Sequence, residues 1–319
     1  MTFEGVVPIL ATPFHDDEAV DLDSWKRLVD FMVGVGVNGV TILGVLGESN
    51  RLRDEERASL IEAALAVTKG RIPVVVGTSH TGTRVTREYS RQAQDLGADA
   101  VMVTPAKEPV PNDDRIVELY QKVADGLTIP IVLQDHPAST DVHMSVALML
   151  RLLKTVPGIG CVKEEAVPTP PKIRQLREGL AERRVPILTG LGALYAPFDL
   201  EAGSEGFNTG FAFPEVLMVL VKAARAGDWR RVHEVYAWFA PLIVFEQQPG
   251  VAVRKEILRR RGLLASARAR HPGATIAPSV AKQVESLIAR TLPGIDVTKP
   301  IPTDQILAVA EGAATVERR

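Results

Sequence analysis

The sequence lacks the features on which disulfide-linked, thiolate-metal and membrane proteins depend. Its single cysteine, Cys161, lies inside an apolar run, which excludes a disulfide framework and a thiolate metal cluster and indicates a buried structural thiol. The most apolar long window, residues 28–46, contains Asp30, Asn38 and four glycines. This composition is typical of a helix, a turn and a strand, and it does not predict a membrane span.

An excess of charge of one sign is also missing. There are 37 Lys and Arg residues against 39 Asp and Glu, so the net charge is −2, which argues against nucleic acid or an acidic membrane as a partner. With 46% apolar and 24% charged residues the composition is ordinary for a globular protein, and a small molecule is the expected ligand. Residues 1–4 lack the basic segment that opens a signal peptide, so we expect a cytoplasmic protein.

Sequence signatures of cofactor and metal sites are absent as well. Gly34, Gly36 and Gly39 match the spacing of dinucleotide-binding turns, but they follow an expected helix and precede an expected strand, the reverse of the order that such a turn needs. The chain has no phosphate-binding P-loop, no paired zinc-ligand spacing and no nucleophile-elbow serine, and its six histidines are scattered. We therefore expect neither a cofactor nor a metal ion.

What the sequence does contain is a regular alternation of short β-rich runs and amphipathic helical segments. The expected strands are residues 6–11, 40–43, 74–77, 100–104, 131–134, 159–163, 185–189 and 206–209. Eight strand–helix units predict an α/β protein, a (β/α)8 TIM barrel in residues 1–226, with a doubly wound sheet as the alternative.

The second half of the prediction concerns residues 227–319, which form a C-terminal helical extension and tail, because the pattern after residue 213 is helical only. The expected helices are residues 213–226, 229–245, 249–261 and 279–290, with a short one near 305–311. The tail after residue 290 is polar and contains prolines, and we expect it to run over the surface.

Lys163 is the central candidate for catalysis. It stands where the expected buried strand 159–163 ends, and in parallel α/β proteins ligands bind at the carboxyl ends of the strands. Desolvation by apolar walls lowers the pKa of a lysine amine, and the free amine then forms a Schiff base with a ketone. The alternative is a lysine that extends from the strand end to solvent.

A glycine-rich segment, residues 43–49, follows the second expected strand. At the carboxyl end of a barrel such a loop offers backbone N–H groups to an anion, for example a substrate carboxylate, and Ser49 adds a further donor. An ordinary tight turn is the alternative interpretation.

Several motifs occur in a recognisable order along the chain. They are Gly44-x-x-Gly47-Glu48-Ser49 after the second expected strand, Val103-Thr104-Pro105 after the fourth, a proline motif after the fifth, and Gly158-Ile159-Gly160-x-x-Lys163-Glu164 at the sixth. Together they resemble the dihydrodipicolinate synthase / N-acetylneuraminate lyase family over residues 5–261. The resemblance implies a barrel enzyme whose Lys163 binds the keto carbon of a pyruvate-like moiety, while the loop of Gly47, Glu48 and Ser49 holds the carboxylate. It also implies a homo-oligomer, a tetramer or a dimer.

Some positions depart from this family pattern. The family tyrosine that relays protons at the end of strand five is Gln134 here, and an amide does no acid–base work near neutral pH. Val45 and Leu46 stand where members close to dihydrodipicolinate synthase carry hydroxyl residues, Ser139 replaces an arginine, and residues 106–107 replace an intersubunit tyrosine pattern. These differences argue against dihydrodipicolinate synthesis.

A narrower branch of the family fits better. Gln134-Asp135-x-Pro137-Ala138-Ser139, Thr78-Ser79-His80 and Ala265-Ser266-x-x-x-Arg270-His271-Pro272 look like the 2-keto-3-deoxyarabonate dehydratases. In that branch a glutamate two residues after the lysine takes over the acid–base work, which implies this role for Glu165. Because residues i and i+2 of a strand share a face, Glu165 is expected to point into the site with Lys163. In the alternative, Glu165 only pairs with Lys163 or caps the next helix.

Other residues are candidate substrate contacts at the ends of further expected strands. His136 shares a face with Gln134 and is a second candidate proton carrier, while His80 is either a ligand of a substrate hydroxyl or a structural histidine. Gly190 leaves room for the substrate or offers its backbone, and Thr209 donates to a hydroxyl.

The sequence thus predicts a metal-independent lyase that forms a Schiff base with a small-molecule 2-keto acid, most specifically a dehydratase of a 2-keto-3-deoxy sugar acid. The alternatives are a pyruvate-dependent aldolase, a dihydrodipicolinate synthase and a non-catalytic paralogue that binds keto acids.

Overall fold

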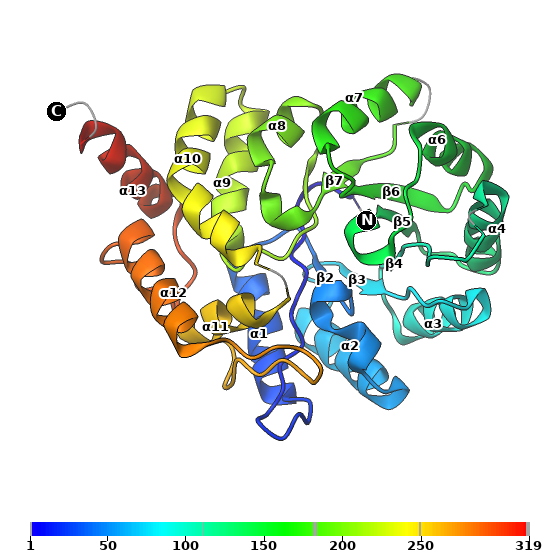
Figure 1. Cartoon of the computed structure of the whole chain (residues 1–319), viewed down its shortest axis with the longest axis horizontal. Helices are drawn as coiled ribbons and strands as arrows, with labels where there is room; N and C mark the ends of the chain where they lie inside the picture. The colour runs from blue at the N-terminus through cyan, green and yellow to red at the C-terminus, as the bar shows by residue number, and fades with distance from the viewer. Residues whose placement is uncertain (1, 111, 181–183, 249, 317–319) are drawn as a thin grey trace.

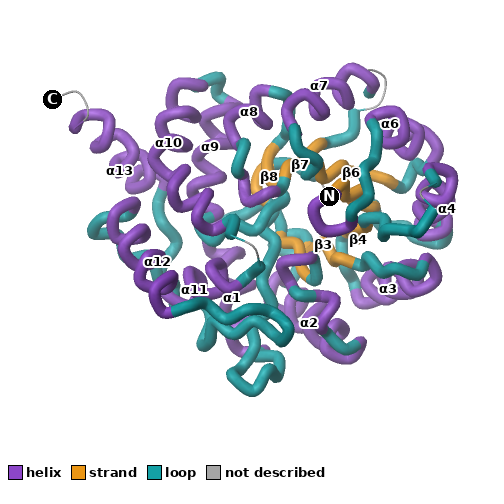
Figure 2. Tube along the Cα trace, in the orientation of Figure 1, coloured by secondary structure: helices purple, strands orange, loops and turns teal. Residues whose placement is uncertain are grey.

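The computed structural model describes residues 2–110, 112–180, 184–248 and 250–316, and in it eight parallel strands form one sheet that helices surround (Figures 1 and 2). The strands are β1 (Gly5–Val6), β2 (Val40–Ile42), β3 (Val74–Gly77), β4 (Ala100–Val103), β5 (Ile131–Asp135), β6 (Ile159–Glu164), β7 (Ile187–Thr189) and β8 (Gly206–Phe207). From β2 to β8 each strand pairs with the next one along the chain, and β8 pairs with β1. The predicted alternation of strands and helices is confirmed.

The sheet closes between β1 and β2, just beyond the regular part of β1. Ile9 and Thr41 form a parallel bridge, the amide of Thr41 donates to the carbonyl of Pro8 at 2.8 Å, and the amide of Leu10 donates to the carbonyl of Thr41 at 2.9 Å. This closure confirms the barrel and excludes the doubly wound sheet. The first strand is shorter than the expected residues 6–11, because Pro8 has no N–H with which to continue the ladder.

Helices follow the strands in turn and cover the outside of the barrel. They are α1 (Leu22–Val35), α2 (Asp54–Thr68), α3 (Thr83–Leu96), α4 (Asp113–Ala124), α5 (Pro137–Thr140), α6 (Val146–Thr155), α7 (Thr169–Gly179), α8 (Ala196–Glu201) and α9 (Pro214–Arg225). Local sequence sets the ends of α1: the Asp21 carboxylate accepts from the Ser24 amide at 2.9 Å, and Gly36, with φ 81°, takes the left-handed conformation that ends the helix.

An apolar cluster inside the barrel lies directly beneath Lys163 along β6. Its members are Phe3, Val7, Val75, Ala100, Met102, Val132, Cys161 and Leu188. Cys161 is fully buried there, as predicted, and burial raises the pKa of its thiol, which keeps it neutral. Lys163 follows Cys161 by two residues on the same face of β6, so this cluster forms the floor beneath it.

The extension consists of α10 (Trp229–Glu246), α11 (Ala252–Arg260), α12 (Pro278–Thr291) and α13 (Thr303–Val316), which lie to one side of the barrel (Figure 1). The expected start of the third of these predicted helices, Pro249, lies outside the described residues. The expectation of a surface tail was wrong: α13 packs against α9 and α10, and Ile301, Ile306 and Ala310 are buried. Within the described residues, no helix is long and apolar enough to cross a membrane. The domain boundary at residue 226 stays a prediction.

Arg261, at the end of α11, joins the extension to the barrel. Its side chain is fully buried, and Nη2 lies 2.6 Å from Oε1 of Glu215 on α9. Nη1 donates to the carbonyl of Ala212 at 2.5 Å, and the guanidinium lies 4.6 Å from the ring centre of Phe213. The extension is thus held by a buried charge pair in addition to apolar packing.

Replacing Arg261 with Met is expected to lower the free energy of unfolding by about 3 to 5 kcal/mol, because the Glu215 carboxylate would remain buried without its partner. Urea unfolding followed by circular dichroism measures this change. Arg259→Met is the matched control: this side chain is 42% exposed and pairs with Glu256, so its removal should cost about 0 to 1 kcal/mol. Equal losses in the two variants would contradict the assignment.

Candidate active site

Lys163 and Glu165 lie together at the carboxyl end of β6. The distance between Lys163 Nζ and Glu165 Oε2 is 3.0 Å, and the two side chains are 1% and 6% exposed. The amide of Glu165 donates to the carbonyl of Asp135 at 2.9 Å, which continues the pairing of β6 with β5 as far as this residue. As the spacing predicted, both side chains therefore point to the same, inner face.

Both oxygens of the Glu165 carboxylate accept further hydrogen bonds. Gln134 Nε2 donates to Oε2 at 2.7 Å, and the amide of Leu191 donates to Oε1 at 3.2 Å. A Cβ atom placed on Gly190 would overlap with Oε1, so only glycine leaves room for the carboxylate at this position. Gln134 and Gly190, both predicted as substrate contacts, thus lie at the site and contact or border Glu165.

For both Lys163 and Glu165, burial and the ion pair shift the pKa in opposite directions. Desolvation lowers the pKa of Lys163, although the adjacent Glu165 carboxylate opposes part of this effect. For Glu165, burial alone would raise the pKa, but the charges of Lys163 and His136 and the hydrogen bond from Gln134 hold it below its ordinary value. The result is a lysine that releases its proton more readily than usual beside a carboxylate that stays ionised near neutral pH.

His136 lies close to this pair, in the loop between β5 and α5. Burial lowers the pKa of its imidazole, and the charges of Glu165 and Lys163 act on it in opposite directions. Its Nδ1 forms a hydrogen bond of 2.5 Å with the Ser139 hydroxyl, which fixes the ring. A largely neutral imidazole near a carboxylate is suited to accept a proton during a reaction.

Glu164, between the two site residues, belongs to the opposite face of β6. Lys172 on α7 forms an ion pair with Asp135 and lies 3.8 Å from Glu164 Oε2, while the Ala166 amide donates to Glu164 Oε1 at 2.7 Å. Burial, and then the nearby Asp135 carboxylate, raise the pKa of Glu164 to about 8. These groups fix the strands to α7 and stay outside the site.

The predicted anion loop forms a 3-10 turn, η1 (Val45–Gly47), at the end of β2. The Gly47 amide donates to the Gly44 carbonyl at 3.0 Å, so it is used inside the turn, whereas the first N–H groups of such a turn have no partner within it. The Thr12 hydroxyl donates to the Gly47 carbonyl at 2.6 Å and braces the turn against the segment that follows β1. Ser49 is half-buried.

The carboxylate of Glu48, in the same loop, pairs with basic side chains, whereas the resemblance implied a contact with the substrate. Its side chain is 1% exposed, Oε1 lies 2.5 Å from Lys255 Nζ, and Oε2 lies 2.7 Å from Arg51 Nη1. The amide of Arg270 donates to Oε2 at 3.0 Å. The carboxylate thus anchors the loop to α11 and to the segment that follows it.

Thr209 lies just after β8 and supports the turn after β7. Its hydroxyl accepts a hydrogen bond from the Gly192 amide at 2.7 Å. This turn, η3 (Leu191–Ala193), contains Leu191 and Ala193 at positive φ, an uncommon conformation for residues other than glycine. The strained turn directs the Leu191 amide at Glu165.

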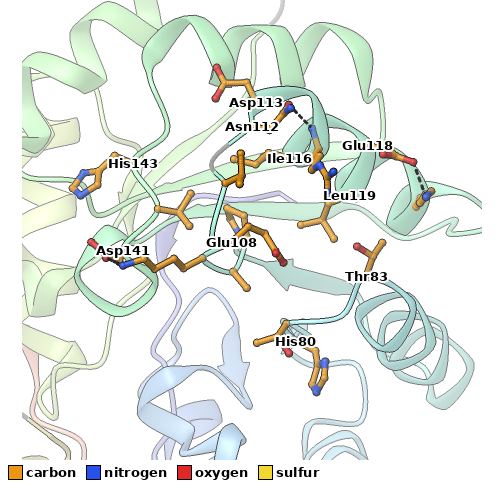
Figure 3. A pocket seen from close by; sticks show the side chains of 18 residues that line it. His80, Thr83, Glu108, Asn112, Asp113, Ile116, Glu118, Leu119, Asp141 and His143 are labelled. Carbon is orange, nitrogen blue, oxygen red and sulfur yellow. Dashed lines mark hydrogen bonds and ion pairs between the residues drawn. The ribbon is translucent and has the colours of Figure 1, made fainter.

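His80 lies apart from these residues. It lines a cavity of about 430 Å3 between the loops that follow β3 and β4, the helix α4 and the segment after α5, together with residues such as Glu108, Asp141 and His143 (Figure 3). Lys163 and Glu165 do not line this cavity. His80 accepts from the Gly82 amide at 3.0 Å and packs edge-on against Tyr89, contacts that suit a structural histidine.

Sequence reasoning missed the residues that α11 brings to this end of the barrel. Lys255 pairs with Glu48, and Arg254, 4% exposed, pairs with Glu246 at 2.5 Å. Consecutive basic residues in a helix are usually exposed, so nothing local marked these two as buried.

The fold and the site together define a class: a (β/α)8-barrel enzyme with a buried lysine amine that is suited to attack a carbonyl and a carboxylate beside it. Comparisons with known proteins agree. The model of the dihydrodipicolinate synthetase family matches residues 2–291. An L-2-keto-3-deoxyarabonate dehydratase of Azospirillum brasilense is 34% identical over 298 residues, which are 90% of this chain and 96% of that protein.

A 4-hydroxy-tetrahydrodipicolinate synthase of Methanocaldococcus jannaschii is 30% identical over 243 residues, 76% of this chain and 82% of that protein. Among solved structures, a dihydrodipicolinate synthase from Rhodopseudomonas palustris is 34% identical with a TM-score of 0.86, covering 90% of this chain and 97% of that chain. The chain therefore belongs to the dihydrodipicolinate synthetase family, and it is a lyase.

The pH dependence of the Lys163 amine is a test of this site. Only the neutral amine attacks a ketone, so the rate of borohydride trapping with pyruvate should rise with pH and level off below pH 10.5, the ordinary lysine pKa, because burial lowers the pKa of Lys163. The Glu165 carboxylate raises that pKa, so Glu165→Gln should move the midpoint to lower pH. An unchanged or higher midpoint in the variant would show that the two groups are not coupled.

Proposed function

We propose that the protein forms a Schiff base through Lys163 and dehydrates a 2-keto-3-deoxy sugar acid such as 2-keto-3-deoxyarabonate. The observation that supports this most strongly is the Glu165 carboxylate, 3.0 Å from the Lys163 amine and hydrogen-bonded to Gln134, the residue that replaces the family tyrosine. A carboxylate held beside the reacting amine supplies the acid–base group that an amide cannot. The relative from Azospirillum brasilense bears this activity in its name.

In the proposed reaction the neutral Lys163 amine adds to the C2 carbonyl, and loss of one water gives a protonated Schiff base. The positive nitrogen acidifies C3, so the Glu165 carboxylate takes a C3 proton and an enamine forms. The enamine electrons then expel the C4 hydroxyl, which leaves as water with the proton that Glu165 carries. Loss of a C5 proton, tautomerisation and hydrolysis of the imine release a 2-keto acid with a terminal aldehyde and restore Lys163.

The ionisation of Glu165 fits this order of events. Because its pKa is held below the ordinary value by Lys163, His136 and Gln134 in spite of burial, the group begins as a base and becomes an acid only after it has taken the C3 proton. His136 is the proposed second proton carrier, for example for the proton lost from C5.

For the substrate carboxylate we propose the loop of Gly47 and Ser49, with the backbone N–H groups at the start of its turn as donors. Glu48 would position this loop through its ion pair with Lys255. Gly190 and Thr209 border the substrate on the side of the strained turn after β7. We leave His80 out of the proposed contacts because it lines the separate cavity of Figure 3.

Two other reactions of the family are weaker candidates. Aldol cleavage starts from the same Schiff base but breaks the C3–C4 bond, which requires a base at the C4 hydroxyl in place of C3. The name of the Methanocaldococcus jannaschii relative points to dihydrodipicolinate synthesis, yet Gln134 provides no proton relay for it. A non-catalytic paralogue would have no use for an ion pair that is costly to bury.

We also propose that the protein is a cytoplasmic homo-oligomer, a tetramer or a dimer. This rests on the family resemblance alone, because Ala106 and Lys107, after β4, replace the family's intersubunit tyrosine pattern. Light scattering on the purified chain measures the state.

Borohydride reduction in the presence of 2-keto-3-deoxyarabonate, followed by peptide mass spectrometry, tests the proposed function. We expect an adduct on Lys163 whose mass is lower, by one water molecule, than that of the intact substrate adduct. Lys163→Arg, which keeps the charge, should give none. An adduct of pyruvate mass formed from the sugar acid would identify an aldolase, and no adduct on the folded protein would exclude the Schiff-base mechanism.

A further inference from the structure

Arg254 brings a second buried cation to the carboxyl end of the barrel from the extension. Its side chain is 4% exposed, and Nε donates to Glu246 Oε1 at 2.5 Å. Within the part of the chain that the structure describes, Nη1 is buried without a hydrogen-bond partner. A buried guanidinium group is costly to leave unsatisfied, so this nitrogen is suited to a ligand that accepts hydrogen bonds.

The unpartnered nitrogen lies beside the loop that follows β2. A Cβ atom on Gly210 would be 2.6 Å from Nη1 and would overlap with the Leu46 side chain, so Nη1 and Leu46 meet at Gly210. Leu46 belongs to the turn whose N–H groups are the proposed carboxylate donors. The Lys163 amine is also within electrostatic range, since the Arg254 charge adds to the larger effect of burial in lowering its pKa.

The surroundings hold Arg254 in this position. Its partner Glu246 is fully buried and accepts from the Ala212 amide at 3.1 Å with each oxygen. The next residue of α11, Lys255, lies 2.5 Å from Glu48 Oε1 and donates to the Arg268 carbonyl at 2.7 Å. Two consecutive residues of α11 therefore meet one loop, and the guanidinium is fixed before any ligand arrives.

We propose that Arg254 binds the carboxylate of the 2-keto acid together with the N–H groups of the loop. In this role it replaces the hydroxyl groups that relatives close to dihydrodipicolinate synthase carry where this chain has Val45 and Leu46. The inference rests on the proposed function, because it assumes a 2-keto acid substrate. Glu246 satisfies one edge of the guanidinium, and the substrate carboxylate satisfies the other through a charge-assisted hydrogen bond.

Two ketones of similar size, one with a charged and one with a neutral group at C1, separate this role from a structural one. Pyruvate carries the carboxylate, whereas pyruvamide has a neutral amide in its place. In borohydride trapping on Lys163, Arg254→Gln should raise the pyruvate concentration for half-maximal adduct formation by about 10- to 100-fold, the effect of losing one hydrogen bond to a charged group. The response to pyruvamide should change much less, because only the small effect of Arg254 on the Lys163 amine is lost there. Arg259→Gln, an exposed position on the same helix, is the matched control and should alter neither.

An unchanged response to pyruvate in Arg254→Gln would overturn the inference, and so would an equal loss with both ketones, which indicates a role in folding or in the amine itself. If Arg254→Gln fails to fold, as judged by circular dichroism, the double variant with Glu246→Gln leaves no unpaired buried charge and supports the same comparison. Failure of the unaltered chain to trap either ketone would overturn the proposed function, so the two failures are distinct.

Discussion

The ion pair between Lys163 and Glu165 is the constraint on which the rest of the site depends. Two opposite charges lie 3.0 Å apart with almost no access to water, and such a pair is tolerated only when its remaining polar atoms are satisfied. Gln134 and the Leu191 amide satisfy the carboxylate, and Gly190 leaves the space that it fills. The end of β5 and the turn after β7 are therefore shaped around one glutamate, which stands in position before a substrate binds.

On β5 and β6, residues of the inner face form the site, whereas residues of the outer face fix the strands to α7. On β6 the inward residues Lys163 and Glu165 meet at the site, whereas Glu164 points outward, where Asp135 of β5 and Lys172 of α7 enclose it. Both clusters contain buried carboxylates, yet the pKa of Glu164 is raised to about 8 by burial and by Asp135, while that of Glu165 is held low in spite of burial by Lys163 and its neighbours. Glu164 lies beside a second carboxylate, Asp135, with which it shares the charge of Lys172, whereas Glu165 has Lys163 3.0 Å away.

The barrel and the pair of Lys163 and Glu165 were predictable because both follow from the local periodicity of the sequence. Alternating strand and helix patterns predicted the fold, and the spacing of two residues predicted that Lys163 and Glu165 share a face. The contribution of the extension was not predictable: the packing of α11 brings Arg254 and Lys255 to this end of the barrel, and the carboxylate of Glu48 meets Lys255 from a distant part of the chain. The same packing buries Ile306 in a tail that the sequence suggested would be exposed.

The account makes Glu165 the base that takes a proton from C3, a role that trapping of the adduct alone does not test. The most direct measurement is the exchange of the methyl hydrogens of pyruvate for deuterium in heavy water, followed by proton NMR, in the unaltered chain and in Glu165→Gln. The account predicts rapid exchange in the former, and in the variant an adduct on Lys163 with exchange slowed by about 100-fold or more, the scale of a lost general base. Equal exchange rates in the two proteins would contradict it and assign the proton transfer to another group, such as His136.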